Sequence, residues 1–317
     1  MKKVVALTII LTTILGVGQV QAKKKFITLG AGWVTGVYYP LAGAMSRIMY
    51  LYAPDFKLTV ESSGASVANA RLIRDKEVDM AILQNDIAYY AYTGTEVFKN
   101  EKPAKNMRGV LALHKETVHI VARKDASINS PADLKGKKVA VGPLGSGTEA
   151  NARQILGVYG LTFKDIKAER LKASEAADFL KDGRIDAAFF TVGQGAAAIM
   201  DVSIITPIKI VPIDDAHFKM LKEKYPFYAR DEIQPGVYKG VNSPVPTVAV
   251  KALLVARKGL STSDVHKFLK VLFDHIDLLH KAHARAKSIS LQTALEGMSI
   301  PLHPGAEEYY KEKGVLK

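Results

Sequence analysis

The sequence predicts an α/β protein with two open lobes, and three observations support this fold class. Short apolar runs alternate with segments whose apolar residues recur at helical spacing, as strands and helices do in βαβ units. The same order of elements occurs twice, about a hundred residues apart. The chain has 317 residues, which is more than one hydrophobic core usually serves.

The first unit is expected to alternate strand and helix, beginning and ending with a strand. Its five elements are predicted at 25–30, 38–52, 56–61, 66–77 and 78–83. The first helix rests on apolar residues spaced three and four apart from Tyr38 onward. Ser66 precedes the apolar period of the second helix and is predicted as its N-cap.

The second unit repeats this order. Its strands and helices are predicted at 138–142, 148–158, 166–171, 174–181 and 185–190. The segment Ile73–Ile82 also matches Leu180–Phe189 in character, position by position. An alternative is that any two βαβ units look alike, because parallel strands require apolar runs and their crossovers require helices. Both interpretations give two α/β lobes.

Two long apolar strands, 109–122 and 247–257, are expected to join the lobes. The region after Ser261 is predicted to form helices that pack on the first lobe, and the Pro- and Gly-rich segment 225–246 to be irregular. The predicted organisation is a signal peptide at 1–22, a first lobe at 23–114 and 249–317, and a second lobe at 115–248.

The first 22 residues have the order of a secretory signal. Lys2 and Lys3 precede an apolar run over 4–17, and Val20-Gln21-Ala22 has the small-x-small pattern of a cleavage site. The alternative is an uncleaved membrane anchor, but the run is short for a spanning helix. The sequence therefore predicts export to the periplasm and cleavage after Ala22.

Composition limits the chemistry. The chain has no cysteine, which excludes disulfides, thiolate metal sites and a cysteine nucleophile. Its formal net charge of +13 is compatible with nucleic acid, an anionic membrane surface, an anionic ligand or a generally basic surface. Export removes nucleic acid as a natural partner.

The loops that follow the predicted strands are the candidate ligand site, because open α/β sheets bind ligands beyond the carboxyl ends of their strands. These loops are rich in small polar residues and glycine, which let a backbone approach a ligand. They span 30–39, 62–69, 84–86, 142–149 and 191–194.

Two of these loops resemble phosphate-binding motifs without matching them. Gly142–Thr148 follows a strand and opens a helix, but the lysine of a nucleotide loop is missing. Its backbone N–H groups at a helix N-terminus predict an anion site, with a plain tight turn as the alternative. Gly30–Gly36 has one residue too many for a dinucleotide fingerprint, so no cofactor is predicted.

No catalytic or metal-binding set is apparent. Ser146 lacks the first glycine of a nucleophile elbow, and no base can be paired with it. His275, His280 and His283 are interpreted as solvated helix residues, since no carboxylate completes a metal set. We therefore predict binding without turnover, with no cofactor and no metal.

Several motifs occur together in an order that resembles one family. They are Thr35-Gly-Val-Tyr-Tyr-Pro40, Ser63-Gly-Ala-Ser-Val-Ala-Asn69, Leu83-Gln-Asn-Asp86, His119 in a strand and Gly145-Ser-Gly-Thr-Glu149. With Pro226, Gly236-Val-Tyr238 and the strand at 248–257, they are similar to the TAXI family of solute receptors for TRAP transporters over nearly the whole mature chain. The resemblance implies a type II periplasmic-binding-protein fold, a TRAP permease partner driven by an ion gradient, and small carboxylate ligands such as glutamate-like amino acids or dicarboxylates.

One departure concerns the first loop, where Trp33 and Val34 stand at positions that are often Gly or Thr in the family. These side chains would narrow the pocket or make it more apolar. The loops and the resemblance together predict the following ligand-binding residues: Thr35, Gly36, Tyr38, Ser63, Gly64, Ser66, Asn69, Gln84, His119, Gly145, Ser146, Gly147, Thr148 and Gly193.

The expected protein is a monomeric periplasmic receptor that captures a small anionic solute between its lobes and delivers it to the permease. Two other functions fit the same loops. One is a sensor subunit that docks on a histidine-kinase ectodomain, and the other is an enzyme built on this scaffold.

Overall fold

A computed structural model describes residues 24–34 and 36–317 of the chain. The predicted signal peptide lies outside the described residues, as does Thr35. In the part of the chain that is described, no helix has the length and apolar character needed to cross a membrane.

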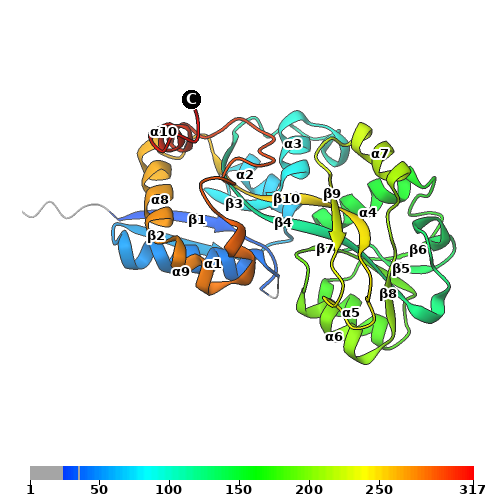
Figure 1. Ribbon diagram of the computed structural model, residues 1–317. Helices are drawn as coiled ribbons and strands as arrows, with labels where there is room; N and C mark the ends of the chain where they lie inside the picture. The colour runs from blue at the N-terminus through cyan, green and yellow to red at the C-terminus, as the bar shows by residue number, and fades with distance from the viewer. Residues whose placement is uncertain (1–23, 35) are drawn as a thin grey trace, which may run out of the picture.

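Strands and helices alternate along the chain as predicted (Figure 1). The strands are β1 (Lys25–Gly30), β2 (Phe56–Glu61), β3 (Met80–Gln84), β4 (Met107–Arg123), β5 (Lys138–Ala140), β6 (Lys167–Glu169), β7 (Ala187–Val192), β8 (Ile208–Ile210), β9 (Ala229–Ile233) and β10 (Val245–Arg257). The α-helices are α1 (Tyr38–Tyr52), α2 (Ser66–Asp75), α3 (Asn85–Thr93), α4 (Gly147–Val158), α5 (Ala173–Lys181), α6 (Ala197–Ile205), α7 (Asp215–Lys224), α8 (Thr262–Asp274), α9 (Ile276–Ala282) and α10 (Pro304–Glu312). The short helices are η1 (Glu96–Phe98), η2 (Lys124–Ala126), η3 (Pro131–Leu134) and η4 (Ala284–Ser288).

The sheet has the same strand order in its two halves. One half runs β2-β1-β3-β10, and the other runs β6-β5-β7-β4, so the first strand of each βαβαβ unit lies between the other two. Strands β1, β2 and β3 pair in parallel, as do β5, β6 and β7, whereas β10 and β4 run antiparallel to them. This arrangement is the predicted periplasmic-binding-protein fold, with two open α/β lobes joined by two long strands.

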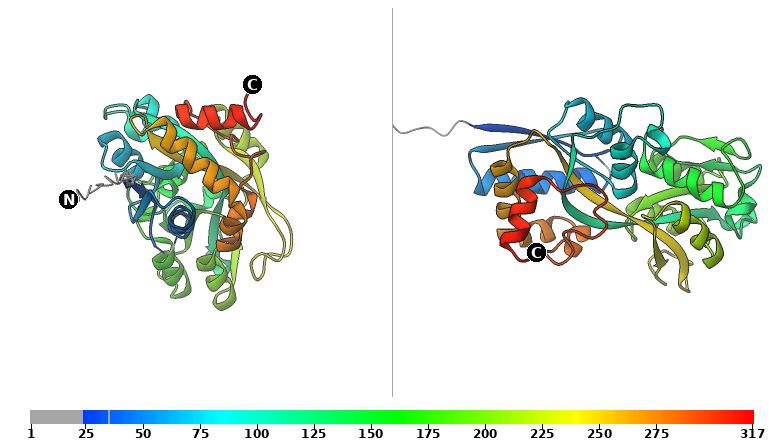
Figure 2. Two further views of the ribbon diagram at one scale, coloured as in Figure 1. Left: turned by 90° about the vertical axis from the view of Figure 1, so that its left-hand side faces the viewer. Right: turned by 90° about the horizontal axis from the view of Figure 1, so that it is seen from above.

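The two lobes lie side by side, with β4 and β10 passing between them (Figures 1 and 2). We call the half containing β1–β3, α1–α3 and α8–α10 lobe I, and the half containing β5–β9 and α4–α7 lobe II. Strand β4 pairs with β10 over residues 107–117, with an irregularity between 112 and 115, and with β7 over 117–122. Residues 114–116 therefore lie where β4 passes from one lobe to the other.

Helix α1 illustrates how an apolar face packs in lobe I. In α1 the buried positions include Leu41, Met45, Ile48 and Met49, spaced three and four apart. The helix ends at Tyr52, because Pro54 follows two residues later and has no N–H to continue the ladder. Helices α8 and α10 pack with α1 in one apolar cluster, so the predicted return of the C-terminal region to lobe I is confirmed.

A further apolar cluster is shared by both lobes. It contains Ile87 and Tyr90 of α3 in lobe I together with Ile155 of α4 in lobe II. The lobes are therefore joined by side-chain packing between α3 and α4 in addition to the two strands.

Two local expectations need correction. Ser66 is the first residue of α2 rather than its N-cap, which is Ala65, and its Oγ accepts a hydrogen bond from the Gln84 N–H instead. The segment 225–246, predicted as irregular, contains β9, which pairs antiparallel with β10. The lobe boundaries at 114/115 and 248/249 stay a prediction.

Candidate functional site

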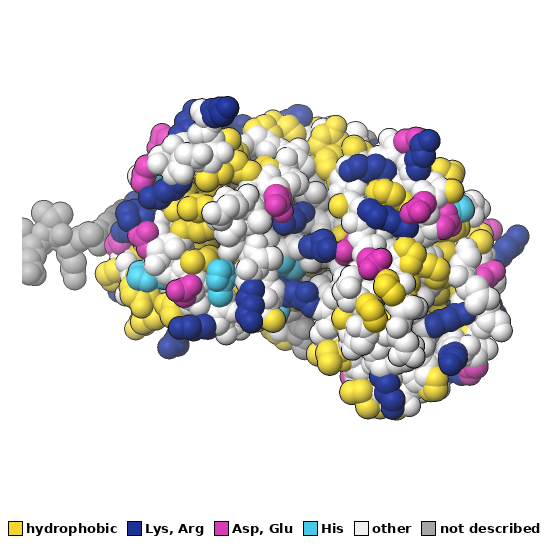
Figure 3. Space-filling view, in the orientation of Figure 1, with side chains coloured by type: hydrophobic (Ala, Val, Ile, Leu, Met, Phe, Trp, Pro, Cys, Tyr) yellow, Lys and Arg dark blue, Asp and Glu magenta, His cyan; other side chains and the backbone are white. Residues whose placement is uncertain are grey.

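A cavity of about 470 Å³ lies between the lobes. It is bordered by the N-terminal ends of α1, α2, α4, α5 and α6, because the loops after parallel strands lead into these helices. In Figure 3 the surface narrows between the two halves, and Lys and Arg side chains lie near this narrowing. Helix N-termini carry partial positive charge, so their convergence favours an anion.

Many of the predicted binding residues meet at this cavity. Those that line it are Gly36, Tyr38, Ser66, Gln84, Ser146, Gly147, Thr148 and Gly193. They come from both lobes, which the sequence-based argument required.

Ser63, Gly64 and Asn69 do not line the cavity. Asn69 is fully buried, and its Nδ2 donates to the carbonyl oxygens of Ala31 and Ile82. The Ser63 hydroxyl donates to Asn69 Oδ1 at 2.6 Å. These residues tie the ends of β1, β2 and β3 together beneath the site.

His119 and Gly145 also lie away from the cavity lining. His119 is buried, with Nε2 3.0 Å from the Tyr238 hydroxyl and Nδ1 3.0 Å from the Thr117 carbonyl oxygen. Burial lowers the pKa of His119 to about 4, which favours the neutral ring at mildly acidic pH. Gly145 donates its N–H to Glu149 Oε2.

Four backbone N–H groups, those of residues 145–148, lie at the N-terminus of α4, and two of them are available to a ligand. The Gly145 and Ser146 N–H groups are used by Glu149 and by the Pro143 carbonyl. Among the described residues, the N–H groups of Gly147 and Thr148 have no hydrogen-bond partner. The Ser146 side chain caps the helix by accepting from the Glu149 N–H at 3.1 Å, so it is a structural residue as well as a lining one.

Gly147 faces a side chain of the opposite lobe. A Cβ at this position would lie 1.8 Å from Oε1 of Gln84, so any larger residue here requires the Gln84 side chain to move. Gln84 Nε2 donates to Asn151 Oδ1 at 3.2 Å across the lobes. A larger residue at Gly147 would displace the Gln84 side chain and disturb this hydrogen bond.

Two cationic residues that were not predicted from the sequence line the cavity. Arg285 of η4 lies against the end of β7, where a Cβ on Gly193 would be 2.4 Å from its Nε. In residues 24–34 and 36–317, no acid forms an ion pair or hydrogen bond with the Arg285 guanidinium. Lys172, at the start of α5, is exposed and its ammonium is likewise unpaired within the described ranges. Neither residue stands in a recognisable motif.

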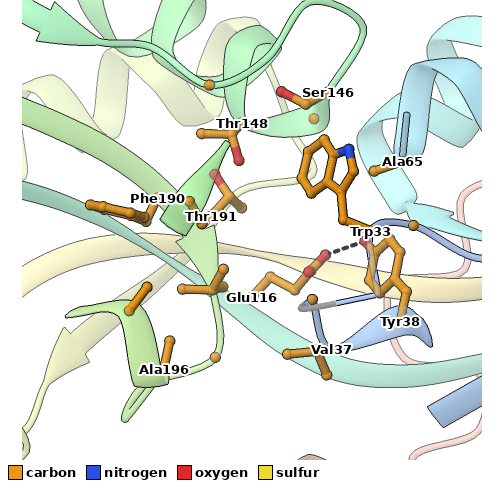
Figure 4. Close-up of a pocket in the computed structure, with 18 of the residues that line it drawn as sticks. Trp33, Val37, Tyr38, Ala65, Glu116, Ser146, Thr148, Phe190, Thr191 and Ala196 are labelled. Carbon is orange, nitrogen blue, oxygen red and sulfur yellow. Dashed lines mark hydrogen bonds between the residues drawn. The ribbon is translucent and has the colours of Figure 1, made fainter. Parts of the chain in front are cut away.

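A buried acid, Glu116, forms part of the cavity wall at the point where β4 passes between the lobes. The Tyr38 hydroxyl donates to Glu116 Oε2 at 2.7 Å (Figure 4). Burial raises the pKa of Glu116 to about 8, and the neighbouring Asp86 carboxyl acts in the same direction. A Glu within an otherwise apolar strand was a signal available in the sequence.

His114 lies beside Glu116, with its Nε2 3.8 Å from Glu116 Oε1. Neither of its ring nitrogens has a hydrogen-bond partner among the described residues. Burial lowers the pKa of His114 to about 3, so the ring is neutral and provides no counter-charge for Glu116.

The remaining walls are largely apolar. Figure 4 shows Trp33 beside Ser146 and Tyr38, and Phe190 on the side of lobe II. His283 is half-buried and lines the cavity next to Arg285, which differs from the solvated position expected for it. Apolar walls with a few convergent polar groups are typical of small-molecule sites.

The acids near the predicted anion site are held away from the cavity. Glu149 accepts from Arg170 Nε at 3.1 Å, and Asp86 accepts from Asn151 Nδ2 at 3.0 Å. Neither lines the cavity. No group of three His, Cys, Asp or Glu side chains able to hold a metal ion occurs in the described ranges.

Comparison with known proteins gives a family and a fold. A family model described as NMT1-like family matches residues 29–314. The periplasmic aliphatic sulphonate binding protein of Escherichia coli has a TM-score of 0.50 and 13% identity, with 91% of this chain and 79% of that chain covered. A protein of Bordetella bronchiseptica RB50 has a TM-score of 0.53 and 15% identity, covering 93% and 90%.

A Listeria monocytogenes protein assigned to L-cystine ABC transport has a TM-score of 0.51 and 16% identity, covering 81% of this chain and 94% of that chain. At these identities the structures establish the fold alone, which is the fold of periplasmic binding proteins. The match to the family model extends over nearly the whole sequence, and the chain therefore belongs to the NMT1-like family.

Proposed function

We propose that this protein is a periplasmic receptor that binds a small organic anion between its two lobes and delivers it to a membrane transporter. The observation that carries the proposal is the Arg285 guanidinium, which has no ion-pair partner among residues 24–34 and 36–317 and lies at a cavity bordered by five helix N-termini. An unpaired cation in such a site is ready to accept a carboxylate or a similar anion in a charge-assisted hydrogen bond.

The site favours recognition over catalysis. The cavity supplies hydrogen-bond donors from both lobes and apolar walls, and its one acid is hydrogen-bonded to a tyrosine. The solutes implied by the motifs are small carboxylates, including glutamate-like amino acids and dicarboxylates. A solute held from both sides stabilises the closed arrangement of the lobes by mass action.

A thermal-shift screen tests this function. Organic acids, amino acids, sulfonates, sugars and polyamines are each added to the purified mature protein. A true solute at about 100 times its dissociation constant stabilises the fold by about 2.7 kcal/mol. Shifts confined to anionic solutes support the proposal. Shifts with neutral or cationic solutes alone, or a recovered solute that is chemically altered, contradict it.

The transporter class rests on the ordered motifs, which resemble receptors of TRAP permeases. Proteins of this fold include one assigned to ABC transport, so the transporter class needs a test of its own. Uptake by cells that contain the cognate permease should collapse when the ion gradient is dissipated and persist when ATP is depleted. The reverse dependence would assign the protein to an ABC transporter.

Export is tested by the processed N-terminus. Cleavage after Ala22 gives a mature protein that begins at Lys23 in the periplasmic fraction. Retention of Met1 on protein in the membrane pellet would contradict this part of the proposal.

A further inference from the structure

Several hydrogen-bond donors at the cavity have no partner among the described residues. They include the Arg285 guanidinium, the Lys172 ammonium and the free N–H groups of Gly147 and Thr148. A solute that complements them must present acceptors, as carboxylate oxygens do. An ammonium group has donors only and would be repelled by the two cations.

Glu116 is the one carboxyl among the residues that line the described cavity, so its protonation decides whether an ammonium has an anionic partner. Gln84 Oε1, which has no hydrogen-bond partner among the described residues, offers only a neutral acceptor. Tyr38 donates to Oε2, and no hydrogen bond joins Oε1 to a described residue. If Glu116 is a neutral acid, Oε1 carries a hydrogen that has no acceptor within the described protein. An acceptor on the solute would then complete the hydrogen bonding of this group.

The groups that surround Glu116 favour its protonated form. Tyr38 faces it from α1, and the Asp86 carboxyl acts on it from α3. On β10 the residue opposite is Val250, which is apolar. On β4 itself the nearest titratable group is His114, which is neutral.

The cations near this region act on His114 instead of pairing with Glu116. Arg285 of η4 and Lys251 of β10 each lower the pKa of His114. His283, which directly precedes η4, acts in the same direction when protonated, although burial lowers its own pKa. No described Lys or Arg makes an ion pair with Glu116, and the His114 ring at 3.8 Å is neutral. A buried carboxylate without a cation partner is costly, and protonation removes that cost.

We propose that Glu116 keeps its proton in the empty cavity and donates it in a hydrogen bond to an oxygen of the bound solute, so that the site selects carboxylates that lack an ammonium group. This inference rests on the proposed function and names the solute class of the same site. No covalent step is involved, because the proton stays on Glu116. Ionisation of Glu116 would remove the donor and place a negative charge beside the bound anion.

The test uses two matched pairs of probes that differ by one amino group: succinate with L-aspartate, and glutarate with L-glutamate. Trp33 is the single tryptophan of the chain and lines the cavity, so its fluorescence reports binding. Titrations run from pH 6 to pH 9.5 on the full mature protein. At least one diacid should bind, at least tenfold more tightly than its amino acid partner. Its affinity should fall about tenfold per pH unit above the pKa of Glu116.

Glu116→Gln keeps a donor but cannot ionise, so its affinity for the diacid should not change with pH. Glu61→Gln, a surface change outside the cavity, should keep the wild-type decline. Tighter binding of an amino acid, an affinity that rises with pH, or a wild-type decline that persists in Glu116→Gln would overturn the proposal. Binding of none of the four probes would overturn it too.

A measurement without solute separates this proposal from the proposed function. Carbon NMR of the glutamate carboxyl groups, compared between wild type and Glu116→Gln, identifies the Glu116 signal. A titration midpoint above pH 7 supports the proposal, and a midpoint below pH 6 overturns it even where the thermal-shift screen has found an anionic solute.

Discussion

Glu116 has a consequence for stability that does not depend on any solute. Its pKa in the folded protein, about 8, lies above the ordinary value of 4.5, so the folded chain binds one more proton than the unfolded chain between these values. The contribution of Glu116 to the free energy of unfolding is therefore largest below about pH 4.5, and it is lost as the pH rises toward 8. The slope is up to about 1.4 kcal/mol per pH unit.

Glu116→Gln should remove that part of the pH dependence. Urea unfolding of both proteins between pH 5 and pH 9 measures it, and the difference in free energy of unfolding should grow in favour of the variant as pH rises. Asp86, whose pKa burial raises to about 6, contributes a slope of the same sign in both proteins and cancels. A constant difference across this range would mean that Glu116 is ionised in the folded protein.

Gly147 and Gly157 make a matched pair in α4. A Cβ at Gly147 displaces Gln84, whereas a Cβ at Gly157 meets nothing within 4 Å. Gly157→Ala should stabilise the protein by roughly 0.5–1 kcal/mol through helix propensity. Gly147→Ala should instead lose the hydrogen bond between Gln84 and Asn151, at a cost of about 0.5–1.5 kcal/mol. Urea unfolding of both variants checks this, and equal stabilisation would show that Gln84 adjusts freely.

At this scale the sequence could predict the small residues of the strand-end loops but not the charged ones. Gly36, Ser66 and Gly147 lie in the connection between a strand and the next helix or at the first residue of that helix, so their positions follow from the fold class. Arg285 stands among several basic residues of a C-terminal segment, and only the packing of η4 against β7 brings it to the cavity.

At the level of elements, α3 and α4 are joined by a buried polar network across the lobes. Asn151 Nδ2 donates to Asp86 Oδ2 at 3.0 Å and to the Tyr228 hydroxyl at 2.7 Å. The Gln154 amide nitrogen donates to the Tyr90 hydroxyl at 3.2 Å. These bonds add a directional connection to the apolar packing between the two helices.

Asn151→Ala should destabilise the protein by about 1–3 kcal/mol, because it leaves buried polar partners unsatisfied. The same change raises the pKa of Asp86 further, since the hydrogen bond from Asn151 lowers it at present. Asn100→Ala, at an exposed position, serves as control and should stay within about 0.5 kcal/mol of wild type. A loss for Asn151→Ala no larger than that of the control would contradict this account of the network.

Periodicity predicted most elements because their apolar faces are regular. Strands β1 and β2 have the predicted bounds, and α4 begins one residue early. Strand β9 was not predicted because Pro and Gly surround it. Its pairing with β10 is a contact between separate segments, which local sequence patterns do not show. The capping role given to Ser66 failed because its hydroxyl accepts from Gln84 across the loop.

At the level of the whole molecule, the repeated βαβαβ order predicted two lobes, and the sheet shows the same strand order in each. The shared cluster between α3 and α4 was outside the reach of sequence patterns, since it depends on how the lobes meet. The lobes therefore meet at a packed side, while the cavity lies at the carboxyl ends of their strands.

The central claim is that this cavity binds an organic anion through Arg285. Calorimetric titration of the anion found by the thermal-shift screen, against wild type, Arg285→Ala and Lys287→Ala, tests it most directly. Lys287 belongs to the same short helix but does not line the cavity. Arg285→Ala should lose about 1.5–3 kcal/mol of binding free energy, roughly a 10- to 150-fold weaker affinity, while Lys287→Ala should bind as wild type. Equal affinity of all three proteins would contradict the account.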